Sequence, residues 1–200
     1  MFRLVSLLIG YAFGLIQMAY IVGRFRGIDI REHGSGNSGT TNAIRTMGAK
    51  AGTIVFVVDM AKAILAFLIA GMIFEQNHDI AGMYAGFGAI LGHCFPFFLK
   101  FKGGKGVACY VGIILVIQLT MGLSILAIGA SLLIFTKYMS ITSLVMAGIT
   151  PIFLYVWRFS GEIIIVSIFS AIICFVMHRS NIKRLLLGTE LQVFGNKNEE

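Results

Sequence analysis

The sequence predicts an all-α, polytopic integral membrane protein that forms a single membrane-embedded domain over residues 1–200. Hydrophobic residues make up 58% of the chain and charged residues only 12%, with a mean hydropathy of +0.89. Several runs of about 20 apolar residues, the length needed to cross the hydrocarbon layer, follow one another with only short polar segments between them. A soluble core of this size could not bury so much apolar surface, so lipid must be the main solvent.

Five of the expected spans can be identified directly from their apolar runs. In order, they are residues 4–22, 53–74, 80–91, 138–157 and 163–177. The first run follows a single early Arg3 and lacks a small-residue cleavage site, which favours a retained span over a removed signal peptide. The polar, glycine-rich residues 24–50 between the first two spans lie outside the lipid.

The 31 uncharged residues from 106 to 136 are long for one crossing and short for two. A tight hairpin turning near residues 120–122 would leave only Arg3 and Arg158 on the side opposite the other basic residues, whereas a single crossing would divide them almost evenly. Because short cytoplasmic loops tend to hold Lys and Arg, we predict the hairpin. The prediction is therefore seven transmembrane helices with short half-membrane hairpins, the N-terminus outside and the C-terminus cytoplasmic.

Composition excludes several classes of function. Three widely spaced cysteines in or beside apolar runs suggest neither a disulfide framework nor a metal cluster. The basic residues behind the net charge of +7 lie in short loops between apolar runs and form no basic stripe interleaved with aromatics, so anionic ligands and membrane orientation explain the charge better than nucleic acid does. Residues 196–200 are acidic at their end and are expected to form a frayed tail.

The first segment that could carry chemistry is residues 34–42, followed by Arg45. Its glycines allow positive φ and let several N–H groups point at one anion. A helix starting within residues 42–50 would favour a phosphate at its N-terminus, and Arg45 could hold that phosphate with two parallel hydrogen bonds. The candidate ligands are Gly34, Ser35, Gly36, Asn37, Gly39, Thr41 and Asn42. The alternative is a flexible, capped loop that binds nothing.

The second segment begins with His93 and continues through the glycine-rich residues 103–106. Gly103, Gly104 and Gly106 would allow close approach of the backbone to a ligand, and Lys105 would supply a charge at the start of the next helix. It is not a Walker A motif because Gly106 stands where Ser or Thr would follow the lysine, which argues against nucleotide hydrolysis. A basic loop that only sets topology is the alternative.

The third segment lies directly beyond the last span. His178 and Asn181 are three residues apart and share a helix face, and Glu190 follows shortly after. Ser143, at the inner end of the sixth span, could contribute a hydroxyl, although capping that helix would explain it equally well. Within the second span, Asp59 and Lys62 are expected to form a structural ion pair near the cavity, because ionisable groups inside a membrane must pair or reach water.

Three sets of residues together resemble the bacterial acyl-phosphate:glycerol-3-phosphate acyltransferase (PlsY) family. They are residues 34–42 with Arg45, residues 92–96 with 101–108, and residues 178–182 with 188–190. The resemblance covers three separated motifs and nearly the whole chain. Three positions depart from the family pattern, with Ser38 in place of a proline, Cys109 in place of a threonine and Ala63 in place of a glycine. None of them removes a proposed charge.

The resemblance implies transfer of a fatty acyl group from acyl phosphate to the 1-hydroxyl of glycerol 3-phosphate. The products would be lysophosphatidate and phosphate, in the first step of phospholipid synthesis. It also implies a multi-pass protein of the bacterial cytoplasmic (inner) membrane whose active site faces the cytoplasm. The donor would come from a soluble enzyme that makes acyl phosphate, and no cofactor or metal would be needed.

For the mechanism, we expect the first loop with Arg45 to hold glycerol 3-phosphate and Lys105 with its glycines to hold acyl phosphate. Which loop holds which phosphate is left open by the sequence. The acyltransferase signature of a histidine four residues before an aspartate is missing. Three routes follow: His178 as general base, proton transfer to the phosphate of the acceptor substrate, or a covalent acyl-Ser35 intermediate. The rival class is a transporter or channel for a phosphorylated solute, which predicts symmetric halves that the chain lacks.

Overall fold

The computed structural model describes residues 1–193 as a bundle of helices, and no strand occurs in this part of the chain. The expected tail at 196–200 lies outside the described residues. The α-helices, in order, are α1 (Phe2–Gly14), α2 (Met18–Phe25), α3 (Thr40–Met47), α4 (Ala49–Ile73), α5 (His78–Cys94), α6 (Val107–Ile117), α7 (Leu119–Thr136), α8 (Met139–Val156), α9 (Gly161–Met177) and α10 (Arg179–Leu186). Three short 3-10 helices connect them: η1 (Ile30–Glu32), η2 (Glu75–Asn77) and η3 (Phe97–Leu99).

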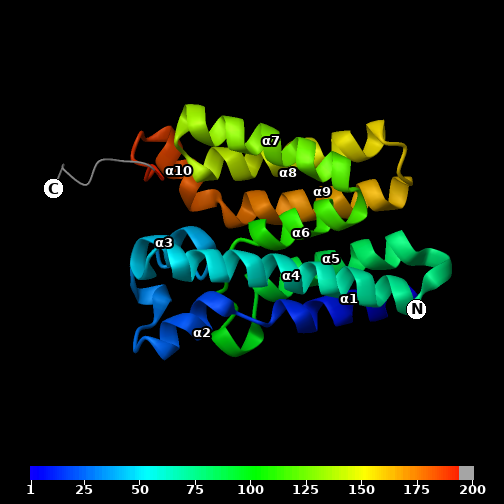
Figure 1. The fold of residues 1–200 in the computed structure, drawn as a ribbon, viewed down its shortest axis with the longest axis horizontal. Coiled ribbons are helices and arrows are strands. Elements are labelled where there is room, and N and C mark those ends of the chain that lie inside the picture. Colours follow the sequence, from blue (N-terminus) through cyan, green and yellow to red (C-terminus); the bar gives the residue numbers. More distant parts are fainter. Residues whose placement is uncertain (194–200) are drawn as a thin grey trace.

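The long helices run nearly parallel to one axis and form two layers (Figure 1). One layer holds α7, α8 and α9; the other holds α1, α4 and α5, and α6 lies between them. Helix α5 is central because it packs against α1, α4, α6 and α9. The two short polar helices α3 and α10 lie at the same end of the bundle, far from the N-terminus (Figure 1).

The apolar helices account for most of the predicted spans. Within residues 1–193, five segments are long and apolar enough to cross a membrane, α1 and α2 together counting as one of them, and the bent pair α9 and α10 would make six if it is one span. The predicted spans 53–74, 80–91, 138–157 and 163–177 correspond to α4, α5, α8 and α9, with ends that differ by a few residues. Helix α6 has only 11 residues, about half the length of an ordinary crossing, so length does not establish the expected seventh crossing.

The first span, predicted as one continuous helix over residues 4–22, is interrupted. Helix α1 ends at Gly14 and α2 begins at Met18. The side chain of Gln17, only 2% exposed, lies in the break and donates from Nε2 to the carbonyl oxygens of Gly14, Gly92 and His93 at 3.0 to 3.2 Å. The buried amide thus satisfies the Gly14 carbonyl at the interruption together with two carbonyls in the last turn of α5, which hydropathy alone does not reveal.

The apolar run 106–136 does form two helices, as the hairpin prediction required, but the turn lies elsewhere. The chain turns at Gln118, in extended conformation with φ −156° and ψ 105°, rather than at residues 120–122. The two arms are also unequal, because α6 has 11 residues while α7 has 18. Only α6 is a half-length helix; α7 is long enough to cross.

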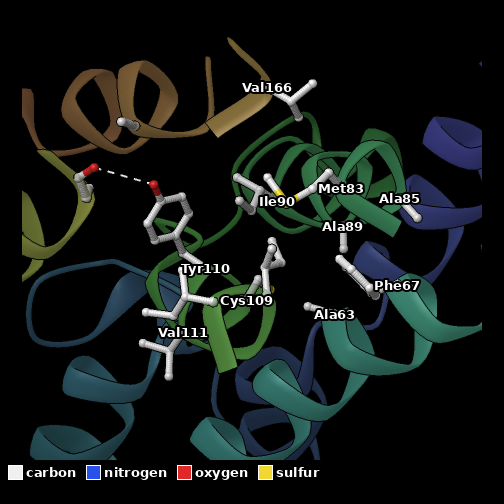
Figure 2. Close-up of a cluster of buried hydrophobic side chains, with 14 of the residues drawn as sticks. Ala63, Phe67, Met83, Ala85, Ala89, Ile90, Cys109, Tyr110, Val111 and Val166 are labelled. Carbon is white, nitrogen blue, oxygen red and sulfur yellow. Dashed lines mark hydrogen bonds between the residues drawn. The ribbon is translucent and has the colours of Figure 1, made fainter. Parts of the chain in front are cut away.

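The core lies where α4, α5, α6 and α9 meet (Figure 2). Small residues such as Ala63, Ala85 and Ala89 alternate there with larger ones such as Phe67 and Ile90. The hydroxyl of Tyr110 donates to the carbonyl oxygen of Ala147 at 3.4 Å, which ties α6 to α8. Small side chains let membrane helices approach closely enough for dispersion to hold them together.

Glycines make the contact between α1 and α5 especially close. Gly10 and Gly14 in α1, and Gly88 and Gly92 in α5, repeat at a spacing of four residues. A Cβ at any of these four positions would overlap backbone atoms of the facing helix. The pair of four-residue glycine repeats therefore sets the distance between α1 and α5, a signal that was available in the sequence.

Candidate active site

A cavity of about 850 Å³, including its open mouth, lies at the end of the bundle that carries α3 and α10. Residues of α3, α4 and α5, the first turns of α6 and α8, and the α9–α10 junction line it. Candidate residues from all three segments and from the sixth predicted span line this one cavity: Ser35, Arg45, Lys105, Ser143, His178 and Asn181. Segments separated by more than 140 residues in the sequence thus share one space.

The first glycine loop is held in shape by Asn42. Its Oδ1 accepts a hydrogen bond from the backbone N–H of Ser35 at 2.9 Å, and its Nδ2 donates to the carbonyl oxygens of Ile30 and His33 at 3.2 and 2.9 Å. The Asn42 side chain is 2% exposed. Asn42 lines the cavity, but its side-chain hydrogen bonds go to backbone groups, and Ser35, whose N–H is bonded to Asn42, offers the cavity its hydroxyl.

Helix α3 places the next group of polar side chains. It begins immediately after Gly39, and Thr40 and Thr41 of its first turn line the cavity. Arg45, one turn further, donates to the carbonyl oxygen of Leu191 at 3.3 Å, which links α3 to the segment that follows α10. Burial lowers the pKa of Arg45, but a guanidinium stays charged at neutral pH.

The second glycine loop packs tightly on the end of α5. The N–H groups of Gly103 and Gly104 donate to the carbonyl oxygens of Cys94 and His93 at 3.1 Å. A Cβ at Gly104 would overlap the His93 imidazole, and one at Gly103 would overlap the His93 backbone. These two glycines do not line the cavity, so in this structure they allow the loop to approach α5 closely rather than contact a ligand.

Lys105 heads a chain of polar contacts across the cavity. Its ammonium donates to Oδ1 of Asn181, whose Nδ2 donates to a carboxylate oxygen of Glu190 at 2.5 Å. Arg184 donates from Nε to the other oxygen at 2.7 Å. Burial lowers the pKa of Lys105 to about 8. Burial alone would raise the pKa of Glu190, but the hydrogen bonds from Asn181 and Arg184 outweigh it and lower the pKa.

His178 and Ser143 present hydrogen-bond acceptors to the cavity. The Nδ1 atom of the buried His178 lies 2.8 Å from the carbonyl oxygen of Cys174, and because a carbonyl can only accept, Nδ1 carries the proton. In the neutral ring, Nε2 is then the acceptor. The hydroxyl of Ser143 donates to the Met139 carbonyl at 2.8 Å, which leaves its oxygen free to accept.

Asp59 and His93 line the inner part of the cavity, and Lys62 lies behind them. The Lys62 ammonium is 2.7 Å from Oδ1 of Asp59 and 2.9 Å from Nδ1 of His93, and it donates to the carbonyl oxygen of Ile16 at 2.5 Å. All three charged or polar side chains are at most 3% exposed. One ammonium thus joins α4 and α5 to the interruption in the first span.

Four helices begin at the cavity, and this arrangement makes it positive. The cavity is lined by residues from the first turn of each helix, among them Thr40 of α3, Val107 of α6, Ser140 of α8 and Asn181 of α10. None of these four turns contains an acidic residue. Helix N-termini carry partial positive charge and unpaired N–H groups. Within residues 1–193, Arg45 and Lys105 also form no ion pair with a carboxylate. The cavity therefore suits anions.

The remaining predicted residues do not all line the cavity. It is lined by Asn37, Gly39, Thr41 and Gly106 but not by Gly34, Gly36 or Lys62. Arg184 was not predicted, although it lines the cavity and pairs with Glu190. Arg184 follows Asn181 by three residues on the same helix face, and this spacing could have indicated that it lies at the site. Among residues 1–193, no three His, Cys, Asp or Glu side chains are placed to hold a metal ion.

Comparison with known proteins agrees with this geometry. A family model described as glycerol-3-phosphate acyltransferase matches residues 4–188. A glycerol-3-phosphate acyltransferase of Thermoanaerobacter sp. (strain X514) is 41% identical over 202 aligned positions, which cover 100% of this chain and 99% of the relative. One from Bacillus subtilis (strain 168) is 40% identical, covering 95% and 98% of the two chains.

The same similarity extends to solved structures. The crystal structure of PlsY, an integral membrane glycerol 3-phosphate acyltransferase, in its glycerol 3-phosphate form superimposes with a TM-score of 0.89, 30% identity and 96% of each chain covered. Its lysophosphatidic acid form gives a TM-score of 0.87 with the same identity, covering 96% of this chain and 95% of that one. The chain therefore belongs to the glycerol-3-phosphate acyltransferase family.

Proposed function

We propose that the chain transfers a fatty acyl group from acyl phosphate to the 1-hydroxyl of glycerol 3-phosphate, giving lysophosphatidate and phosphate. The observation that carries this proposal is the convergence of four helix N-termini, Arg45, Lys105 and Arg184 on one cavity that also has apolar walls. Two phosphate groups held beside each other need a surplus of cations and N–H donors. A donor that carries its own phosphate makes full use of that surplus.

The cavity also offers a surface for the acyl chain. Phe56, Val107, Met139 and Leu191 line it together with the polar groups. An acyl phosphate could therefore place its phosphate near the helix N-termini and its hydrocarbon chain along these side chains. We assign glycerol 3-phosphate to Arg45 and the first loop, and acyl phosphate to Lys105 and the start of α6.

In the reaction, the 1-hydroxyl oxygen attacks the acyl carbonyl carbon and forms the new ester bond. The bond from that carbon to the phosphate oxygen breaks, and the phosphate leaves with the electron pair. Because the departing phosphate would otherwise carry a third negative charge, it becomes the strongest base in the cavity and takes the hydroxyl proton. His178 accepts a hydrogen bond through Nε2 from the neighbouring 2-hydroxyl of glycerol 3-phosphate and so positions the 1-hydroxyl, whose own proton faces the departing phosphate. Lys105 and the N–H groups stabilise the oxyanion.

We further propose that the whole chain is one domain with seven crossings, α6 being the short one. The N-terminus would lie outside and the C-terminus in the cytoplasm of a bacterial inner membrane, with the cavity facing the cytoplasm. The clustering of Lys and Arg in the loops at the cavity end supports this orientation. A soluble enzyme would then supply acyl phosphate from the cytoplasmic side, at the entry to phospholipid synthesis.

The test uses the purified full chain in detergent with acyl phosphate and labelled glycerol 3-phosphate. Lysophosphatidate formed without a sealed vesicle supports the enzyme over a transporter. Acyl-CoA and acyl carrier protein thioesters, supplied in place of acyl phosphate, should give no product. Product from a thioester at the same rate would refute the proposed donor.

A His178→Ala variant tests the route of the proton. If the leaving phosphate takes the proton, the variant should lose rate because the hydroxyl is poorly oriented, but its rate should keep the same dependence on pH. A loss of one limb of the pH profile would instead identify His178 as the general base and refute this step.

A further inference from the structure

The loop between α5 and α6 exposes an aromatic and basic surface that the proposed reaction does not use. Phe97, Phe98 and Phe101 are 59%, 49% and 61% exposed, and Lys100 and Lys102 are also exposed. We call these five residues the loop surface. Three phenylalanines exposed within five residues would be costly in water, because each ring carries a large apolar area.

The loop surface is held rigidly by the residues beneath it. Leu99 is 5% exposed, and the N–H groups of Phe101 and Lys102 donate to the carbonyl oxygens of Pro96 and Leu99 at 3.0 and 3.2 Å. Lys100 and Phe101 both have positive φ, 55° and 59°, a conformation that non-glycine residues rarely adopt. The exposed rings are therefore not a frayed segment, because the backbone that carries them is fixed by hydrogen bonds.

The loop surface lies on the side of the bundle rather than at its polar end. The hydroxyl of Tyr11, in α1, donates to the carbonyl oxygen of Phe95 at 2.9 Å, which places the loop beside α1. Figure 1 shows the green turn around residues 97–99 protruding on the side that carries α1 and α2, next to the junction of these two helices. In a protein that spans a membrane, this side faces lipid.

The charge of the loop surface identifies the part of the lipid that it fits. No acidic residue occurs between Asp79 and Glu162 in the sequence, and within residues 1–193 neither Lys100 nor Lys102 forms an ion pair. Aromatic rings at the boundary of the acyl chains with ammonium groups at headgroup level are the usual pattern of an interfacial lipid contact. Acidic phosphates of lipid headgroups are the matching partner.

We propose that the loop surface binds anionic phospholipid headgroups of the surrounding leaflet, with its phenylalanines inserted among the acyl chains. Lys105, which lines the cavity, follows Lys102 by three residues. The N–H groups of Gly103 and Gly104, between the two lysines, donate hydrogen bonds to carbonyl oxygens at the end of α5. The bound lipid thus steadies the segment that carries Lys105. The proposal concerns lipid binding and stands independently of the acyl donor.

The first experiment locates the loop relative to the membrane. Trp157 is the only tryptophan, so Phe98→Trp combined with Trp157→Phe gives a single fluorophore in the full chain. In phosphatidylcholine vesicles, lipids brominated near the headgroup end of the acyl chain should quench its emission, and aqueous iodide should not. Quenching by iodide without quenching by bromine would place the loop in water and overturn the proposal.

The second experiment measures headgroup binding in detergent micelles with a fluorescent phosphatidylglycerol. Removing both charges in K100Q/K102Q should weaken binding about 30-fold, from about fivefold for each lysine near an anionic surface. The control K50Q/K183Q removes the same charge from exposed lysines outside the loop and the cavity, and it should bind as the wild type does. Equal weakening of both variants, or displacement of the lipid by free inorganic phosphate, would refute the loop surface as the lipid site.

Discussion

The buried position of Lys105 predicts how catalysis depends on pH. Burial lowers its pKa to about 8, and its charged form is the one that can hold a phosphate. Since the folded pKa is below that of a free lysine, the charge is present below pH 8 and is lost as the pH rises through that value. About nine-tenths of Lys105 is protonated at pH 7 but only about one-tenth at pH 9, so kcat/KM should fall about tenfold between them.

The assay follows lysophosphatidate from labelled glycerol 3-phosphate, with the donor concentration at each pH corrected for uncatalysed hydrolysis. The second ionisation of a phosphate monoester, near pH 6, is complete above pH 7 and does not contribute to the fall. Lys105→Arg should be slower at pH 7, because a guanidinium differs in shape and donor geometry, but its kcat/KM should stay level from pH 7 to 9. A level profile in the wild type, or the same fall in Lys105→Arg, would refute the role of the lysine charge.

Three further substitutions test the supports of the cavity. Asn42→Ala removes the hydrogen bonds that hold the first loop and should lower the free energy of unfolding by about 1–3 kcal/mol while raising KM for glycerol 3-phosphate; an unchanged KM would contradict its positioning of the loop. Gly104→Ala should reduce kcat/KM at least tenfold because its methyl group would displace His93 or the loop, whereas Gly161→Ala, which meets no atom within 4 Å, should be neutral. Lys62→Met leaves Asp59 buried without its partner and should lower the free energy of unfolding, measured by thermal denaturation, by about 3–5 kcal/mol. Adding Asp59→Leu should recover much of that loss, and no recovery would show that the unpaired Asp59 carboxylate is not its source.

Much of the fold could be predicted because a membrane imposes strong rules on sequence. Apolar runs located α4, α5, α8 and α9, and the basic loops indicated that residues 106–136 turn back as two helices. The interruption of the first span could not be predicted in this way, since residues 4–22 are uncharged throughout. Its cause is three-dimensional: the freed carbonyls are satisfied by Gln17 within the break and by Lys62 from another helix.

For the candidate site, residue types and spacing selected cations and acceptors from separated segments, and these line one cavity. They did not separate groups that face the cavity from groups that shape it. Gly103 and Gly104 have the composition of an anion-binding loop, but they pack on His93 and the end of α5. Asn42 lines the cavity, yet its side-chain hydrogen bonds go to backbone groups. That distinction depends on which atoms pack nearby, which the local sequence does not encode.

The short length of α6 explains why the cavity is recessed between the helices. Gly103 and Gly104 fold the loop back against His93, so α6 starts beside the end of α5 and has only 11 residues. Its N-terminus, with Lys105 just before it, therefore points into a space walled by α4, α5 and α8. Away from bulk water, the same charges and N–H groups interact more strongly with a developing oxyanion. A full-length α6 would carry this positive end to the membrane surface, where water would screen it.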